Sequence, residues 1–206
     1  MKDMLTAIAA LVLSTWTASP SSDVWVYPHS SDPGGEEYMR VWGDGEKAID
    51  SIVPPADSFS YGYMQFDLKD LPKGELKSAK LTVWNVANEE LKDDVLTAAP
   101  LEVFGLKGTF VEKTFSFLDA KCQPVAPSLG KAKGEKGADG IKLEFDLMDA
   151  NGDFAKLVEA SRSVGSLGLT LASKISPEDS RGMIYKVNTK EGPEKLRPSL
   201  SLTFAD

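Results

Sequence analysis

The sequence predicts an all-β protein: a jelly-roll β-sandwich of two antiparallel sheets with one short α-helix. From residue 23 onward, short segments in which apolar and polar residues alternate recur along the chain. Stretches rich in Gly and Pro, such as DPGG, VPPADS and EGPEKLRP, separate these segments and are typical of turns. The loops differ in length and no fixed repeat is visible, which favours a sandwich over a propeller.

The alternating segments predict strands at Asp23–Tyr27, Tyr38–Trp42, Ser60–Leu68, Ser78–Val86, Leu101–Leu106, Thr114–Phe117, Ile141–Leu147, Leu167–Ser173, Met183–Val187 and Ser199–Phe204. The polar stretch GKAKGEKGADG is expected to be a solvated loop. In DANGDFAKLVEASRS, Asp153 is expected to cap the helix, because Phe154, Leu157 and Val158 then fall on one face.

A single domain, residues 20–206, is expected to follow a secretory signal peptide, residues 1–19. Lys2 precedes an apolar run from Met4 to Leu13, and small residues follow at 17–19. The run is too short to span a bilayer, so no membrane insertion is expected. The predicted location is secreted, extracellular or at the cell surface; a merely apolar N-terminal segment is the alternative.

Charge and rare residues exclude several classes of function. The chain has 31 acidic and 23 basic residues, a net charge of -8, which opposes binding to nucleic-acid phosphates. His29 and Cys122 are the only histidine and the only cysteine, so neither an intrachain disulfide nor a histidine-rich metal site can form. No G-x-S-x-G motif is present either, so the usual nucleophilic machinery is absent.

Several motifs occur in an order that resembles the DNRLRE domain family, which overlaps carbohydrate-binding module family 96. YGYMQFDLKDLPKGELKSAKLTVW is similar to the family's YLRFDLSSLP and ITSAKLRLY stretches, and FVEKTFSF to its W-x-E-x-T-V-T-W element. LEFDLMDANGDFAKLVEA and SLGLTL resemble its strand, short helix and G-F-A-L strand. TKEGPEKLRPSLSLTF resembles its closing S-K-E and R-P-x-L-x-V. The resemblance covers Tyr61 to Phe204, with a weaker match at YMRVWG.

The resemblance implies a lectin-like jelly roll of secreted polysaccharide-degrading or surface proteins. It implies an acidic polysaccharide such as alginate as the ligand, and it supplies no catalytic motif. Gln65 stands where the family usually has a basic residue.

The strand faces give candidate ligand-binding residues independently of the family. Side chains alternate between the two sides of a strand, so Met64, Phe66 and Leu68 are expected in the core. If three of the strands share a sheet, one outer face collects Tyr38, Arg40, Trp42, Tyr61, Tyr63, Gln65, Lys80 and Trp84. Aromatic faces suit sugar C–H groups, and guanidinium and amide groups suit hydroxyls and carboxylates. The alternative is that this face packs under the helix or long loops.

The sequence thus predicts a non-catalytic carbohydrate-binding domain with a polysaccharide as its partner. The alternative is a structural or adhesive domain that meets surface or matrix proteins. A third possibility is a polysaccharide lyase that uses Tyr63 with Arg40. Glu112 is expected to fix a turn through backbone hydrogen bonds. No cofactor is expected, except for a possible structural calcium ion near Asp23, Asp32, Asp44 and Asp50.

Overall fold

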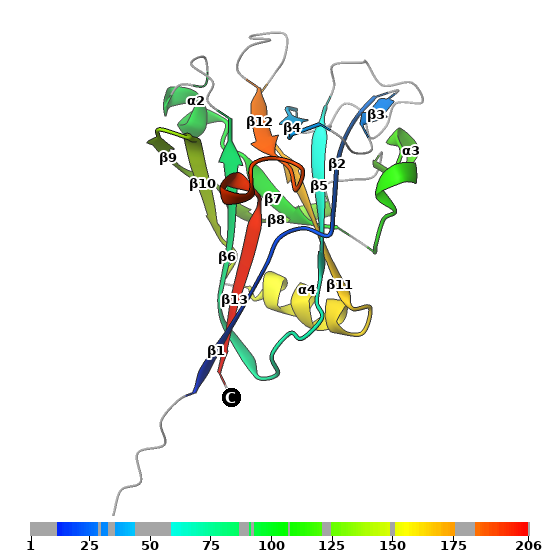
Figure 1. Cartoon of the computed structure of the whole chain (residues 1–206), viewed down its shortest axis with the longest axis vertical. Helices are drawn as coiled ribbons and strands as arrows, with labels where there is room; N and C mark the ends of the chain where they lie inside the picture. Colours follow the sequence, from blue (N-terminus) through cyan, green and yellow to red (C-terminus); the bar gives the residue numbers. More distant parts are fainter. Residues whose placement is uncertain are drawn as a thin grey trace, which may run out of the picture.

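The protein is a β-sandwich of two antiparallel sheets, which confirms the predicted all-β class (Figure 1). The structure is a computed structural model of the 206-residue chain. It describes residues 12–28, 30–32, 36–43, 59–86, 91, 93–106, 108–120, 125–148, 151–175 and 184–205.

The larger sheet has the strand order β1 (Leu13–Ala18), β13 (Ser199–Ala205), β6 (Glu75–Asn85), β10 (Gly140–Asp146) and β9 (Lys133–Gly137); β12 (Tyr185–Asn188) joins β6 to β4 (Tyr38–Val41). The smaller sheet has the order β3 (Ser30–Asp32), β2 (Ser22–Tyr27), β5 (Tyr61–Asp67), β11 (Ser166–Ala172), β7 (Glu102–Gly105) and β8 (Val125–Lys131). The helical elements are α2 (Asp93–Ala98), η1 (Glu112–Thr114), α3 (Phe117–Ala120), α4 (Asp153–Arg162) and η2 (Glu194–Leu196).

The core lies between the sheets and is built by the predicted alternation. Met64 and Phe66 of β5 and Leu81 and Val83 of β6 are completely buried there. Burying such a side chain stabilises the fold by about 1.5–3 kcal/mol, so these positions are the main source of stability.

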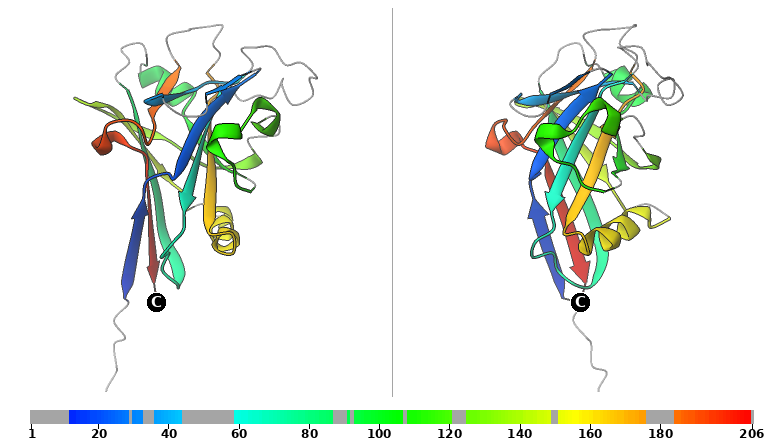
Figure 2. Two further views of the ribbon diagram at one scale, coloured as in Figure 1. Left: turned by 45° about the vertical axis from the view of Figure 1, so that its right-hand side comes forward. Right: turned by 90° about the vertical axis from the view of Figure 1, so that its right-hand side faces the viewer.

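Helix α4 lies at one end of the sandwich, the lower end in both views of Figure 2. Its predicted apolar face is confirmed, since Phe154 and Val158 are buried. Arg162 fixes the helix to the larger sheet, with Cζ 5.1 Å from the Phe204 ring. The expected cap is wrong by one residue: Gly152, with φ of 67°, precedes the helix and Asp153 is its first residue.

The three strands expected to share a sheet are divided between the two sheets. β4 and β6 belong to the larger sheet and β5 belongs to the smaller one. The expectation of one outer face is therefore wrong for the residues of β5, whereas β4 and β6 share a sheet through β12. Alternation determines which side chains point inward, but it carries no information on which strands are neighbours.

β1 lies within residues 1–19, the segment expected to be a signal peptide. It pairs antiparallel with β13, from Leu13 opposite Ala205 to Ala18 opposite Leu200. The Trp16 indole packs against the core and donates from Nε1 to the Lys69 carbonyl at 3.2 Å. A chain cut after residue 19 would therefore lack one strand of the larger sheet.

Two further expectations about local structure are wrong. The expected loop GKAKGEKGADG contains β9, which pairs with β10. All five residues of β9 are exposed, so no alternation marks it. The expected strand at Thr114–Phe117 is replaced by η1 and α3, where Asp119 accepts hydrogen bonds from the backbone and side chain of Ser116. The bond from the Ser116 side chain is the main cause that holds the pKa of Asp119 below its ordinary value, and the bond from the Ser116 amide adds to it.

Within the described part of the chain, no helix combines the length and apolar character that crossing a membrane requires.

Candidate functional site

β4 lies at the end of the sandwich opposite α4, beside β2 (Figure 1), and side chains from these two strands form an aromatic–guanidinium cluster. We define it as Trp25 and Tyr27 of β2, Tyr38 and Arg40 of β4, and Trp42, which follows β4. Tyr38, Arg40 and Trp42 were expected to bind ligand from the sequence. Trp25 and Tyr27 were not, although they alternate along β2 in the same way.

The rings of the cluster are in mutual contact. Trp25 and Tyr27 are stacked, with centroids 5.2 Å apart and planes at 17°. The Trp42 ring lies 6.4 Å from Trp25 and 6.3 Å from Tyr27. Arg40 Cζ lies 5.5 Å from the Trp25 ring and 5.5 Å from the Tyr38 ring, so two aromatic faces hold the guanidinium.

Local pairing explains how two sheets contribute to one cluster. β4 pairs with β12 of the larger sheet, and Trp42 forms a bridge to Ser60 just before β5 of the smaller sheet. The Trp42 amide donates to the Ser60 carbonyl at 3.0 Å, and Ser60 Oγ donates to the Arg40 carbonyl at 2.6 Å. These bonds place Arg40 and Trp42 beside β2.

Several polar atoms of the cluster are buried without a hydrogen-bond partner in the described structure: Trp25 Nε1, Trp42 Nε1 and Arg40 Nε. The same holds for Oε2 of Glu36, which lies beside the cluster. Trp25 is only 7% exposed. Glu36 Oε2 is 3.8 Å from Arg40 Nη2, and the two side chains are 40% and 39% exposed. An unpaired buried donor costs about 1–3 kcal/mol, so a hydrogen-bond partner at these atoms would stabilise the protein.

The remaining expected ligand residues of β5 lie under another part of the chain. Tyr61 and Tyr63 are completely buried in a second apolar cluster with Phe110 and Phe115. The Tyr63 and Phe115 centroids are 4.7 Å apart. The segment from Leu106 to Phe115 covers these tyrosines, and Gln65 Oε1 holds it in place by accepting a hydrogen bond from the Phe110 amide at 2.9 Å. These residues present no ligand surface here, so the packing alternative describes them, and Tyr63 and Arg40 lie in different clusters.

The buried hydroxyl of Tyr63 gives a stability prediction. Burial raises its pKa well above the ordinary value, and it has no hydrogen-bond partner among the described residues. Tyr63→Phe is therefore expected to keep or raise the free energy of unfolding in urea. The matched variant is Tyr185→Phe, which loses a 3.0 Å bond to the Ala99 carbonyl and should cost about 1 kcal/mol. Equal losses in both variants would contradict the expectation.

Lys80 and Trp84 of β6 lie on the outer face of the larger sheet. Lys80 Nζ is 3.3 Å from Glu144 Oε1, and Lys142 Nζ is 3.2 Å from Glu144 Oε2. Burial acts to raise the pKa of Glu144, but hydrogen bonds from the two lysines bring it below the ordinary value. Trp84 is half-buried opposite Lys142 in the register. This face is a second place where a sugar ring could stack.

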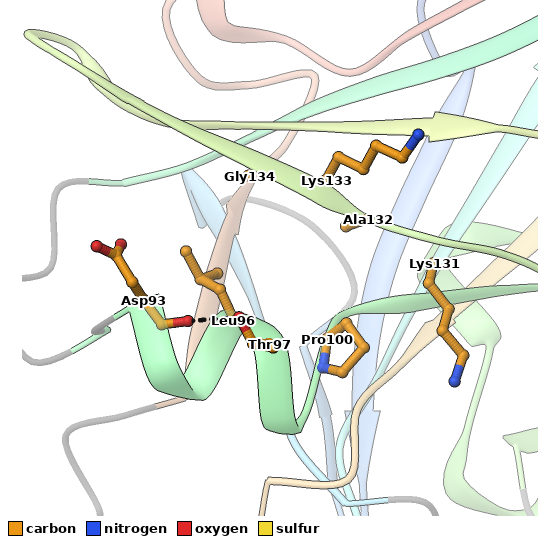
Figure 3. Close-up of a pocket in the computed structure, with 8 residues that line it drawn as sticks. All are labelled: Asp93, Leu96, Thr97, Pro100, Lys131, Ala132, Lys133 and Gly134. Atoms are coloured by element: carbon orange, nitrogen blue, oxygen red, sulfur yellow. Dashed lines mark hydrogen bonds between the residues drawn. The ribbon is translucent and has the colours of Figure 1, made fainter.

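A depression of about 370 Å³ lies between α2 and the turn from β8 to β9 (Figure 3). Its polar groups are largely engaged: Asp93 pairs with Lys136 at 2.8 Å, and Thr97 Oγ1 donates to the Asp93 carbonyl. Lys131 pairs with Glu102, and the side chains of Lys131 and Lys133 point in different directions in Figure 3. The depression does not present a common anion site.

The residues considered for a metal do not form a centre in the described structure. No group of three or more His, Cys, Asp or Glu side chains suited to a metal ion occurs in the ranges that the structure describes. Asp23 is buried, and its Oδ2 accepts from the Lys190 amide at 2.7 Å. Asp32 lies in β3, while Asp44 and Asp50 lie outside the described residues, as do His29 and Cys122.

Glu112 differs from its expected role. Its Oε1 lies 2.8 Å from Lys190 Nζ, so it forms an ion pair between η1 and the turn after β12. Glu112 was expected to fix a turn through backbone hydrogen bonds, but the described partner of its carboxylate is the Lys190 side chain. Sequence reasoning missed Lys190 as the partner, because the two residues are separated by 78 positions.

Fold and geometry together define a two-sheet β-sandwich with an aromatic–guanidinium cluster at one end. Comparisons with models of known protein families and with curated proteins find no match. The similarity to the DNRLRE family therefore rests on the quoted motifs.

Proposed function

We propose that the protein is a secreted, non-catalytic carbohydrate-binding domain and that the aromatic–guanidinium cluster binds its glycan. The observation that carries the proposal is the set of buried, unpaired polar atoms of Trp25, Arg40 and Trp42 beside stacked rings. Sugars have flat C–H patches that can stack on the aromatic rings. They also have hydroxyl groups that can form hydrogen bonds with the unpaired polar atoms.

An acidic polysaccharide such as alginate is the proposed ligand. The Arg40 guanidinium is partly exposed, and its ion pair with Glu36 is long, at 3.8 Å. Exposed pairs of this kind contribute about 0–1 kcal/mol, so a uronate carboxylate can replace Glu36 at little cost. The planar fork of arginine can then hold that carboxylate with two hydrogen bonds.

Affinity electrophoresis in gels that contain alginate, pectin or neutral glucan tests this function. Acidic gels are expected to retard the protein. Trp42→Ala and Arg40→Ala are expected to weaken binding at least about tenfold, which corresponds to about 1.4 kcal/mol. Arg40→Lys keeps the charge but loses the fork, so it should weaken binding as well. Trp84→Ala, a tryptophan change on the outer face of the larger sheet, is the matched control and should bind normally.

The other outcomes are equally informative. Loss of binding in Trp84→Ala with normal binding in Trp42→Ala would move the site to the outer face of the larger sheet. An absence of binding to any glycan would favour the structural or adhesive alternative, with surface or matrix proteins as partners. Release of unsaturated sugar ends would instead indicate a lyase.

A further inference from the structure

One turn, which follows β12, holds the two strands that carry the aromatic–guanidinium cluster. The Thr189 amide donates to the Glu37 carbonyl at 3.0 Å, and Thr189 Oγ1 donates to the Glu36 carbonyl at 2.8 Å, directly before β4. On the other side, the Lys190 amide donates to Asp23 Oδ2 of β2 at 2.7 Å. The turn therefore sets the spacing between β2 and the start of β4.

This spacing controls the geometry of the cluster. Asp23 and Trp25 are two positions apart on β2, so their side chains point to the same face. Arg40 of β4 lies with Cζ 5.5 Å from the Trp25 ring. A movement of β2 relative to β4 would change this contact directly. The hydrogen bond from the Lys190 amide to Asp23 therefore helps to hold the Trp25 ring against the Arg40 guanidinium.

The charges around Asp23 are unbalanced. Lys190 Nζ pairs with Glu112 of η1 at 2.8 Å, bonds to Glu191, and lies 4.0 Å from Asp23 Oδ1. Three carboxyl groups share one ammonium group, and Asp23 is only 2% exposed. Although partial burial acts to lower it, the bonds to Glu112 and Glu191 hold the pKa of Lys190 above its ordinary value. The lysine therefore stays charged while Asp23 titrates.

Burial is the main cause that raises the pKa of Asp23 from 3.8 to about 7. The charges of Glu191 and Glu112 raise it further, while the Lys190 amide and ammonium lower it. The charged groups on α3 and β4, which also contact β2, are bonded elsewhere: Asp119 to Ser116, and Arg40 to Glu36. A proton bound this way stabilises the fold fully below about pH 4, and this contribution is lost as the pH rises to about 7.

We propose that Asp23 is a positioning residue for the aromatic–guanidinium cluster, and that loss of its carboxyl proton loosens the turn from β2 and weakens glycan binding. Ionised Asp23 brings a further negative charge beside Glu112 and Glu191 and competes with them for Lys190. Because these negative charges repel one another, β2 and the turn move apart. The effect on glycan binding rests on the proposed function, whereas the effect on the cluster itself does not.

NMR of the free protein tests the effect on the cluster. The indole N–H signals of Trp25 and Trp42 are expected to shift with a midpoint near pH 7. The signal of Trp16, whose Nε1 bonds to the Lys69 carbonyl, should stay in place. Asp23→Asn imitates the protonated carboxyl, so it should hold the cluster signals at their low-pH positions over the whole range. If the wild-type cluster signals do not titrate, or titrate unchanged in Asp23→Asn, the inference is overturned.

Two further variants test whether Asp23 or another group causes the titration. His29 is the only histidine, and histidine side chains ordinarily titrate near neutral pH, so His29→Gln should leave the shifts of the cluster signals unchanged. Glu112→Gln removes a neighbouring negative charge and frees Lys190 for Asp23, so it should move the midpoint to lower pH. Loss of the titration in His29→Gln, or a midpoint that does not move in Glu112→Gln, would also contradict the inference.

Binding to an alginate oligosaccharide tests the link to function. The affinity of the wild type is expected to fall on the order of fivefold between about pH 5.5 and about pH 8.5. Asp23→Asn should bind with the same affinity at both pH values. Constant wild-type affinity would overturn the coupling to ligand. Titrating indole signals without any glycan binding would instead contradict the proposed function and leave the positioning role of Asp23 standing.

Discussion

A chain that begins at Pro20 is expected to unfold at a lower urea concentration than a chain that begins at Val12. Only the shorter chain lacks β1 and, with it, the strand pairing to β13 and the Trp16 contact with Lys69. Loss of a packed tryptophan and of a row of backbone hydrogen bonds is expected to cost about 3 kcal/mol or more, out of a typical total of 5–15 kcal/mol.

The comparison between these two chains isolates β1, because both lack the residues before Val12. Circular dichroism should follow unfolding, since the tryptophan content of the two chains differs. Without β1, one edge of β13 is left with unpaired backbone groups, which favours association with another strand. The shorter chain is therefore also expected to elute as larger species in size-exclusion chromatography. Equal midpoints and equal elution would show that β1 is dispensable, as cleavage after residue 19 requires.

Gly168→Ala is expected to destabilise the protein by about 2–3 kcal/mol, the range of an overpacked core. A Cβ at this position would lie 2.9 Å from Cβ and 2.9 Å from Cδ2 of Leu106. The Leu106 Cβ cannot swing aside, because the Leu106 amide is bonded to the Gly168 carbonyl at 3.0 Å. The cover over Tyr63 begins at Leu106, so it should loosen too, and the Phe110 amide should exchange its hydrogen faster.

Gly137→Ala is the matched control. Gly137 is an exposed strand glycine, and its added Cβ would meet only the Gly140 carbonyl at 3.8 Å, an ordinary contact. The free energy of unfolding should change by less than about 0.5 kcal/mol. A similar loss in both variants would show that the effect comes from the general cost of replacing a strand glycine and not from Leu106.

The sequence predicted strands where one side of the strand is buried. Ser199–Phe204 and Ile141–Leu147 alternate, and the structure has β13 and β10 there. β9 was missed because its stability comes from backbone pairing with β10, which leaves no side-chain pattern. The short helix α3 was missed as well, although Ser116 and Asp119 have the spacing of a capping box. That spacing was the signal that could have corrected the expected strand.

The candidate site was predicted in part, for a physical reason. Tyr38, Arg40 and Trp42 alternate along one strand, so their common location followed from local geometry. Tyr63 was grouped with them on the assumption of a shared sheet, which fails because β5 belongs to the smaller sheet, and strand order is a property of the whole chain. The contact between Trp25 and Arg40 likewise depends on how β4 meets β2, which no local pattern reveals.

The pairing of β1 with β13 also bears on how the protein is made. Leu13 lies opposite Ala205, so the two strands meet only after nearly the whole intervening chain has been synthesised. At translation rates of about 5–20 residues per second, Trp16 waits roughly ten to forty seconds for its partner strand. Strand pairing over such separation is slow to form. During that interval the side chains of β1 are accessible to chaperones, until the strand pairs with β13.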